Sequence, residues 1–200
     1  KGRGRGGNAW SCPRGEGLLF SLVLEPDIDR SQWSRLALAT GLAVSDAIRK
    51  QGLEAQIKWP NDVWIHGKKC AGILVEGCGG CVIVGVGLNV CMTDFPTEIQ
   101  HSATSLAKEG VELVSREALL ADIVSGIFQW GSRCGADFPA VVTAVNERCA
   151  LRGEMIQLRR ESELIHGMML GLNKDGHLLL EREHGIEQLA QADEVRKLRV

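Results

Sequence analysis

Four strand-like segments follow one another between residues 55 and 90, joined only by short turns. The turns contain Pro60-Asn61-Asp62, His66-Gly67 and Gly77-Cys78-Gly79-Gly80, and these residue types favour tight reversals of the chain. A parallel pair of strands needs a crossover of about a dozen residues or more, for which this stretch has no room. We therefore predict an antiparallel meander with strands over residues 56–59, 63–65, 70–76 and 81–90.

A second group of short strand-like segments fills the chain from residue 151 to its end. Turn residues separate them at regular intervals, a pattern that is typical of small β-barrels. The expected strands cover residues 155–158, 163–172, 178–181, 186–189 and 194–200. We predict a five-stranded barrel that forms a second domain over residues 151–200, after a first domain of residues 1–150.

The remaining regular structure is expected to be mainly helical, which makes the fold class α/β in the broad sense (α+β). Residues 31–50 carry apolar side chains at helical spacing, with Ser31 as the expected N-cap and Gly52 as the expected stop. An apolar run closed by Pro26 predicts a buried strand over residues 17–24. Further helices are expected over residues 103–108, 116–130 and 140–148.

The composition is that of an ordinary globular chain. Of the 200 residues, 44% are hydrophobic and 24% are charged. The formal net charge of −2 excludes a chain held on nucleic acid by its overall basicity, and we expect this segment to bind none. No apolar run approaches the ~18 residues that a membrane helix needs, so we expect no membrane association either.

Seven cysteines, an odd number, are scattered along the chain. A chain of this length does not need disulfides to be stable, so this usage predicts a reducing, cytoplasmic setting. Cys78 and Cys81 form a C-x-x-C pair on an expected hairpin turn, but no second pair or histidine lies at the spacing of a zinc site. The chain opens on Lys1 within a glycine-arginine run, so we also expect a segment upstream of it.

The opening run Gly2-Arg3-Gly4-Arg5-Gly6-Gly7 is too rich in glycine to favour a helix or a packed strand. Its backbone N–H groups and its two guanidinium groups suit the binding of a phosphate or a carboxylate. The alternative interpretation is a flexible Arg-Gly tail with affinity for RNA.

Two further segments carry charges that suit an anionic ligand. Asn61 and Asp62 are displayed at a strand end, where a carboxylate can hold Mg²⁺ or accept a proton. A purely structural turn is the alternative there. Lys69 stands at the start of an apolar strand, and simple alternation places it on one face together with Ala71, Ile73 and Val75.

The segment Val84-Gly85-Val86-Gly87-Leu88-Asn89 has glycine at alternate positions. One face of this strand is therefore bare backbone, against which a flat ligand can lie. A bulge or a tight packing contact is the alternative. The segment is unlike a dinucleotide-binding fingerprint, because no G-x-G-x-x-G opens a helix here.

Taken in order, the segments GRGRGGNAW, KWPNDV, GKKCAGIL and VGVGLN resemble those of the biotin protein ligase family, the biotin–[acetyl-CoA-carboxylase] ligases. The resemblance extends from Lys1 into the C-terminal barrel. It implies a mixed, largely antiparallel sheet with helices, related to class II aminoacyl-tRNA synthetases and lipoate ligases, followed by an SH3-like barrel.

The resemblance also implies a reaction in two steps. Biotin attacks the α-phosphate of ATP to give biotinyl-5′-AMP, with Mg²⁺ as the accompanying metal. The adenylate then acylates one lysine of the biotin carboxyl carrier protein of acetyl-CoA carboxylase. Such attack of one anion on another requires cations and oriented dipoles where charge accumulates.

Individual roles follow from the same resemblance. The expected catalytic residues are Lys69, Arg5 and Asp62, and Asp62 is also the expected Mg²⁺ ligand. The residues expected to contact biotin are Arg3, Gly4, Arg5, Lys69, Gly72, Leu74 and Gly85. The residues expected to contact ATP or the adenylate are Gly2, Trp10, Asn61 and Asn89. Arg5 is expected either to contact phosphate or to pair with Asp62.

The sequence departs from the family pattern in places. Gly6 stands where family members often have a third basic residue, and the closing segment ADEVRKLRV follows the usual last barrel strand only loosely. The family's biotin-binding Ser-Thr-Asn segment and its glutamine lie upstream of the glycine-rich run of residues 2–7 (the glycine loop), outside this sequence. Two alternatives stay open, a biotin-operon repressor with an upstream DNA-binding domain and a relative of lipoate ligases. Homodimerisation through an edge strand also stays open.

Overall fold

The computed structural model describes residues 2–7, 9–160 and 163–198. Its first sheet has five strands in the order β3-β7-β6-β5-β4, and neighbouring strands are antiparallel throughout. The strands are β3 (Gly17–Leu24), β4 (Ala55–Lys58), β5 (Asp62–Ile65), β6 (Lys68–Cys78) and β7 (Cys81–Asn89). The predicted meander is confirmed. Parallel pairing among the described residues is limited to two isolated bridges, Ile57 with Cys149 and Lys69 with Ala103.

The C-terminal part forms a second five-stranded antiparallel sheet in the order β11-β10-β9-β8-β12. Its strands are β8 (Met155–Arg160), β9 (Glu163–Leu172), β10 (Leu178–Arg182), β11 (Gly185–Leu189) and β12 (Asp193–Lys197). All five predicted strands are present. The last two positions of the strand expected over residues 194–200 lie outside the described residues.

The first long helix, α1 (Arg35–Arg49), follows a short 3₁₀ turn, η2 (Arg30–Gln32). The expectation that Ser31 caps this helix is wrong. Ser31 lies inside η2, whose cap is Asp29: the Asp29 carboxylate accepts hydrogen bonds from the Ser31 backbone N–H at 3.0 Å and from the Ser31 hydroxyl at 2.9 Å. The N-cap position of α1 itself is Ser34, whose side chain makes no capping hydrogen bond. The expected stop is confirmed, since Gly52 has a φ of +85°, which favours glycine.

Two more helices lie in the second half of the first domain, α2 (Arg116–Ala136) and α3 (Phe138–Glu147). The helix expected over residues 103–108 is wrong. This stretch instead forms turns that run along strand ends, where Thr104 donates its backbone N–H to the Lys69 carbonyl and Ala107 donates to that of Val90. These bonds between distant segments replace the local bonds of a helix. Among the described helices, none is long and apolar enough to cross a membrane.

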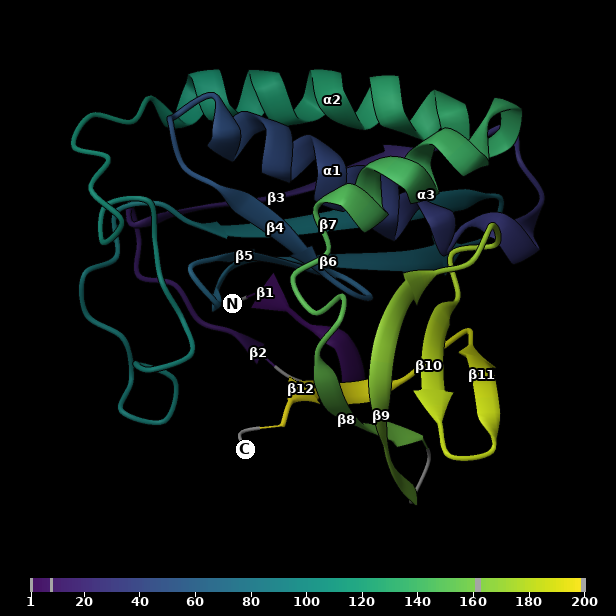
Figure 1. The fold of residues 1–200 in the computed structure, drawn as a ribbon. Coiled ribbons are helices and arrows are strands. Elements are labelled where there is room, and N and C mark those ends of the chain that lie inside the picture. The colour runs from purple at the N-terminus through teal and green to yellow at the C-terminus, as the bar shows by residue number, and fades with distance from the viewer. Residues whose placement is uncertain (1, 8, 161–162, 199–200) are drawn as a thin grey trace.

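The elements form layers (Figure 1). Helix α2 lies over α1, and α1 lies on one face of the first sheet, above β4 and β6. The helix-facing side chains of the sheet, such as Ile73, Val84 and Leu88, are almost fully buried. The opposite face of the sheet looks toward the opening segment and the C-terminal sheet.

The C-terminal sheet is tied to the first sheet both directly and through α3. The chain leaving α3 runs beside β4, where Ile57 donates its backbone N–H to the Arg148 carbonyl at 2.8 Å. The indole N–H of the buried Trp59 donates to the Gly176 carbonyl at 3.1 Å. The Asn146 side chain bonds both backbone groups of Leu172. These contacts fix how the second sheet is presented to the first, while a domain boundary near residue 150 stays a prediction.

Helix α2 crosses α1 at a glycine, and this contact yields a stability prediction. A Cβ built on Gly126 would lie 2.9 Å from the Ala43 Cβ, whereas one built on Gly131 of the same helix meets nothing closer than 3.7 Å. We expect Gly126→Ala to lower the free energy of unfolding by about 1 kcal/mol or more, because the helices must separate. We expect Gly131→Ala to raise it by about 0.5–1 kcal/mol through helix propensity. Urea denaturation of both variants checks the prediction, and equal effects would contradict it.

Candidate functional site

One row of residues runs straight across the open face of the first sheet. Lys58 pairs with Asp62, Asp62 with Gly72, Gly72 with Gly87, and Gly87 with Leu19. Residues that are paired across neighbouring strands point to the same face. Two charged side chains therefore stand at one end of a floor whose middle is bare glycine backbone.

A β-bulge brings Lys69 to this row. Val63 pairs with Ala71 but the next residue, Trp64, pairs with Lys69, so Cys70 is an extra residue in β6. The extra residue moves Lys69 to the opposite face from that given by simple alternation. The expectation that Lys69 shares a face with Ala71, Ile73 and Val75 is therefore wrong. Lys69 lies instead on the open face, with its Nζ 2.6 Å from Asp62 Oδ1.

Asp62 is held between two ammonium groups. Its Oδ1 faces Lys69, and its Oδ2 lies 3.4 Å from the Nζ of Lys58. The side chain of Lys58 is only 13% exposed. Burial lowers the pKa of Lys58, and the positive charges of Lys69 and Arg5 act in the same direction, while Asp62 opposes them. Sequence reasoning assigned Lys58 no role, although it precedes Trp59-Pro60-Asn61-Asp62 directly.

Asn61 connects this charged cluster to the opening segment. Two hydrogen bonds join Asn61 to Ile73 on β6. The Ile73 backbone N–H donates to the Asn61 carbonyl at 2.8 Å, and the Asn61 Nδ2 donates to the Ile73 carbonyl at 2.7 Å. Its Oδ1 accepts a hydrogen bond from Arg5 at 3.2 Å. A second contact of Arg5 is with Asp193 of β12, at 3.7 Å. These two contacts fall on Asn61 and Asp193, whereas the sequence led us to expect phosphate or Asp62 as the partner.

The opening segment is more regular than expected. Strand β1 (Gly2–Arg3) pairs with β2 (Ala9–Trp10), and η1 (Arg5–Gly7) forms a 3₁₀ turn between them. The expectation that this run forms no strand or helix is therefore wrong in detail. Gly6 and Gly7 have φ values of +61° and +79°, so glycine supplies the sharp reversal that allows the short pairing. Positions 1 and 8 lie outside the described residues.

Trp10 lies flat on the glycine floor. A Cβ built on Gly87 would come within 2.7 Å of the indole ring, and one built on Gly72 within 2.9 Å. The Lys69 ammonium lies 5.5 Å from the ring centroid, within the range of a cation–π contact. The indole N–H is buried and has no hydrogen-bond partner among the described residues. A buried N–H without a partner is costly, and a polar ligand atom beside it would remove that cost.

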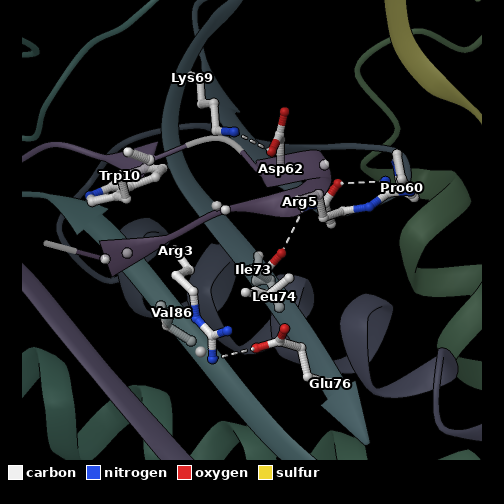
Figure 2. A pocket seen from close by; sticks show the side chains of 18 of the residues that line it. Arg3, Arg5, Trp10, Pro60, Asp62, Lys69, Ile73, Leu74, Glu76 and Val86 are labelled. Carbon is white, nitrogen blue, oxygen red and sulfur yellow. Dashed lines mark hydrogen bonds and ion pairs between the residues drawn. The ribbon is translucent and has the colours of Figure 1, made fainter.

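These residues line one cavity of about 960 Å³, shown in Figure 2. In that view Lys69 and Asp62 point toward each other, and Arg3 reaches Glu76, to which it is paired at 3.4 Å. Sequence-predicted site residues found on the lining are Gly2, Arg3, Gly4, Arg5, Trp10, Asn61, Asp62, Lys69, Gly72, Leu74 and Gly85. The predicted convergence of the opening arginines with Lys69 and Asp62 is therefore present in the geometry.

Asn89 is the predicted site residue that does not line this cavity. It is 5% exposed, and its Nδ2 donates to the Thr104 carbonyl at 2.9 Å. Sequence reasoning also missed part of the lining. Ser21 and Gly87 come from the first sheet, and residues 159 and 192–195 come from the C-terminal sheet. Alternation on β7 indicates Gly87, but nothing in the sequence signals that the C-terminal sheet reaches the cavity.

The residues present do not fit a metal ion held by the protein. Both oxygens of Asp62, the expected Mg²⁺ ligand, already face lysine ammonium groups. Within the described part of the chain, no three His, Cys, Asp or Glu side chains gather in a way that could hold a metal. Magnesium is commonly bound through substrate phosphates. A Mg²⁺ that arrives with a nucleotide would therefore be held mainly by the nucleotide.

Comparisons with known proteins agree on one family. The sequence pattern of the biotin/lipoate A/B protein ligase family matches residues 1–89. The bifunctional ligase/repressor BirA of Bacillus subtilis is 34% identical over 96% of this chain, and the chain spans 62% of the length of that relative. The biotin–[acetyl-CoA-carboxylase] ligase of Paracoccus denitrificans is 30% identical, and the match covers 96% of this chain and 85% of that protein.

A solved structure gives the same result for the fold. The biotin protein ligase of Aquifex aeolicus in complex with biotin and ATP superimposes with a TM-score of 0.90 at 30% sequence identity. The match covers 98% of this chain and 84% of the Aquifex chain. The overall fold, including both parts of the chain, is therefore shared. The chain belongs to the biotin protein ligase family.

Proposed function

We propose that this protein uses ATP to attach biotin to a lysine of the biotin carboxyl carrier protein of acetyl-CoA carboxylase, through biotinyl-5′-AMP. The observation that carries the proposal is the Lys58–Asp62–Lys69 cluster at the edge of a glycine-floored cavity. Positive charge beside an apolar floor suits a ligand that joins a carboxylate or phosphate to an uncharged ring. Relatives named biotin–[acetyl-CoA-carboxylase] ligase support the identity of that ligand.

In the first step, a carboxylate oxygen of biotin attacks the α-phosphorus of ATP. The bond between that phosphorus and the oxygen bridging to the β-phosphorus breaks, and pyrophosphate leaves with the bonding electrons. Two anions must approach each other, so cations at the site lower the barrier. We assign Lys69 to the biotin carboxylate and the α-phosphate. Lys58 and Arg5 add positive charge beside it.

The binding roles follow the lining of the cavity. The small floor of Gly72 and Gly85, with Leu74 beside it, is assigned to the uncharged rings of biotin, and Arg3 and Gly4 cover them from the opening segment. Gly2, Trp10 and Asn61 are assigned to the nucleotide side. Asn89 keeps its proposed contact with adenine only if ligand binding draws its side chain away from Thr104.

In the second step, the amine nitrogen of the acceptor lysine attacks the acyl carbon of biotinyl-5′-AMP. The bond from this carbon to the phosphate oxygen breaks, AMP leaves, and an amide forms. The amine must lose a proton, and we assign the Asp62 carboxylate, which faces the incoming amine, as the group that accepts it. Lys69 stays on the phosphate as in the first step. Mg²⁺ is proposed to accompany ATP, and the reaction is placed in the cytoplasm.

Two alternatives have specific support. The family pattern that matches residues 1–89 includes lipoate ligases as well as biotin ligases. The Bacillus subtilis relative is named as both a ligase and a repressor, and this chain spans only part of its length. A repressor activity would therefore depend on sequence outside these 200 residues, and reading that sequence would decide it.

The decisive experiment measures pyrophosphate release by the complete protein with Mg-ATP and one carboxylic acid at a time. We expect pyrophosphate release with biotin. With lipoate or octanoate we expect the rate to be lower by at least about 100-fold, because their flexible chains cannot form hydrogen bonds with the polar groups of the cavity. Comparable rates with lipoate would overturn the choice of substrate. Absence of release with all three acids would overturn the proposed chemistry.

A further inference from the structure

The C-terminal sheet reaches the same cavity as the glycine loop. Arg159 of β8 and Asp193 of β12, together with residues 192 and 194–195, form part of the cavity lining. The opening segment lies between the two sheets, as Figure 1 shows. One contact across this gap joins a predicted catalytic side chain to the C-terminal sheet, namely Arg5 Nη2 with Asp193 Oδ1 at 3.7 Å.

The backbone around Asp193 is shaped for this contact. Asp193 pairs with Arg159, but Arg196 pairs with Gln157, so β12 carries one extra residue at this point. Glu194 within the bulge has a φ of +50°, a conformation that costs free energy for a residue with a Cβ. A bulge at the end of a strand changes the direction in which the side chains point, and residues with a strained backbone are concentrated at functional sites.

The neighbours of Asp193 hold it in place. Ala192 and Val195 are 4% and 3% exposed, so the backbone is anchored in the core of the C-terminal sheet on both sides. The carboxylate of Glu194 is paired within its own sheet, with Arg159 at 3.4 Å and with Arg196 at 3.7 Å. Asp193 instead presents a 68% exposed side chain toward the glycine loop. The anchored strand β12 thus directs the Asp193 carboxylate toward the Arg5 guanidinium of the opening segment.

We propose that Asp193 is a positioning residue, which holds Arg5 over the cavity from the C-terminal sheet while Asn61 holds it from the first sheet. The proposal rests on the proposed function for its meaning in catalysis. A guanidinium carries five N–H donors in a fixed plane, so it can bond a carboxylate on one edge and a ligand phosphate on another. Asp193 therefore orders the loop in advance of the ligand, which lowers the entropy that ligand binding must overcome.

The test compares Asp193→Asn with Asp175→Asn. Asp175 is an exposed carboxylate in a turn of the same sheet and does not line the cavity, so both variants remove one negative charge from the C-terminal part. Hydrogen exchange of residues 2–10 is measured without ligand. We expect about three- to fivefold faster exchange in Asp193→Asn only, the size of an exposed ion pair. We expect residues 2–10 of Asp193→Glu, which keeps the negative charge, to exchange as slowly as those of the unaltered protein.

A double-mutant cycle separates positioning from general stability. We expect Asp193→Asn to raise the KM for biotin and ATP about three- to fivefold with a smaller change in kcat, and to have no effect once Arg5 is replaced by Ala. Equal exchange in Asp193→Asn and Asp175→Asn, or an undiminished effect in the Arg5→Ala background, would overturn the proposal. If the unaltered protein binds neither biotin nor ATP, the proposed function fails, and the ligand-free exchange still decides the role of Asp193.

Discussion

Replacing Lys69 by Ala is expected to reduce biotin-dependent pyrophosphate release by about 10²–10³-fold, the usual cost of removing one oriented charge from a transition state. The Lys69 ammonium contacts Asp62 and also lies close to Gly72 and to the ring of Trp10. Its removal leaves the attacking carboxylate and the α-phosphate without the charge that offsets their repulsion. The measurement is single-turnover formation of the adenylate, with saturating ATP and biotin.

The neighbouring lysine provides a matched control. Lys68 precedes Lys69 in the same strand, but it pairs with Ile65 and does not line the cavity. Lys68→Ala removes the same charge from the same strand and should change the rate less than about twofold, because this side chain does not reach the cavity. A similar loss in both variants would show that strand stability, and not the position of the Lys69 ammonium, sets the rate.

The overall fold follows from local signals in the sequence because those signals are strong here. Tight turns between residues 55 and 90 exclude crossovers, so the meander has essentially one solution. The five C-terminal strands are equally well marked by their turns. The end of α2 could not be predicted, since Gly131 and Gly135 weaken the helix locally while packing on α1 extends it to Ala136.

The sequence predicted many of the residues that line the site, but not how their side chains are arranged. The glycine and lysine motifs name most of the lining, yet they do not reveal the extra residue at Cys70 that turns Lys69 toward Asp62. A bulge depends on how two strands pair, and one strand alone does not determine that register. The contribution of Asp193 was hidden for a similar reason, because it depends on how one sheet is placed against another.

Replacing Gly87 by Val is expected to weaken biotin binding by about 10- to 100-fold, as overpacking of a tight site by 1–3 kcal/mol implies. The new Cβ would come within 2.7 Å of Trp10 in the ligand-free protein, so the indole must leave the floor. The added methyl groups would also crowd Gly72, the cross-strand partner of Gly87, and so narrow the floor that is assigned to the rings of biotin. Titration calorimetry with biotin gives the affinity, and thermal unfolding shows whether the fold is retained.

Two other glycines separate loss of the site from loss of the fold. Gly85 lies two residues away on the same strand face, and a Cβ there meets nothing closer than 3.7 Å, so Gly85→Val fits the ligand-free protein. It should nevertheless weaken biotin binding to a similar extent, because its side chain fills the same floor. Gly80, at the hairpin tip, has open space around it, and Gly80→Val should leave the affinity unchanged. Full affinity in Gly85→Val would mean that the ligand does not lie on these glycines, and the assignment of the floor to biotin would then be wrong.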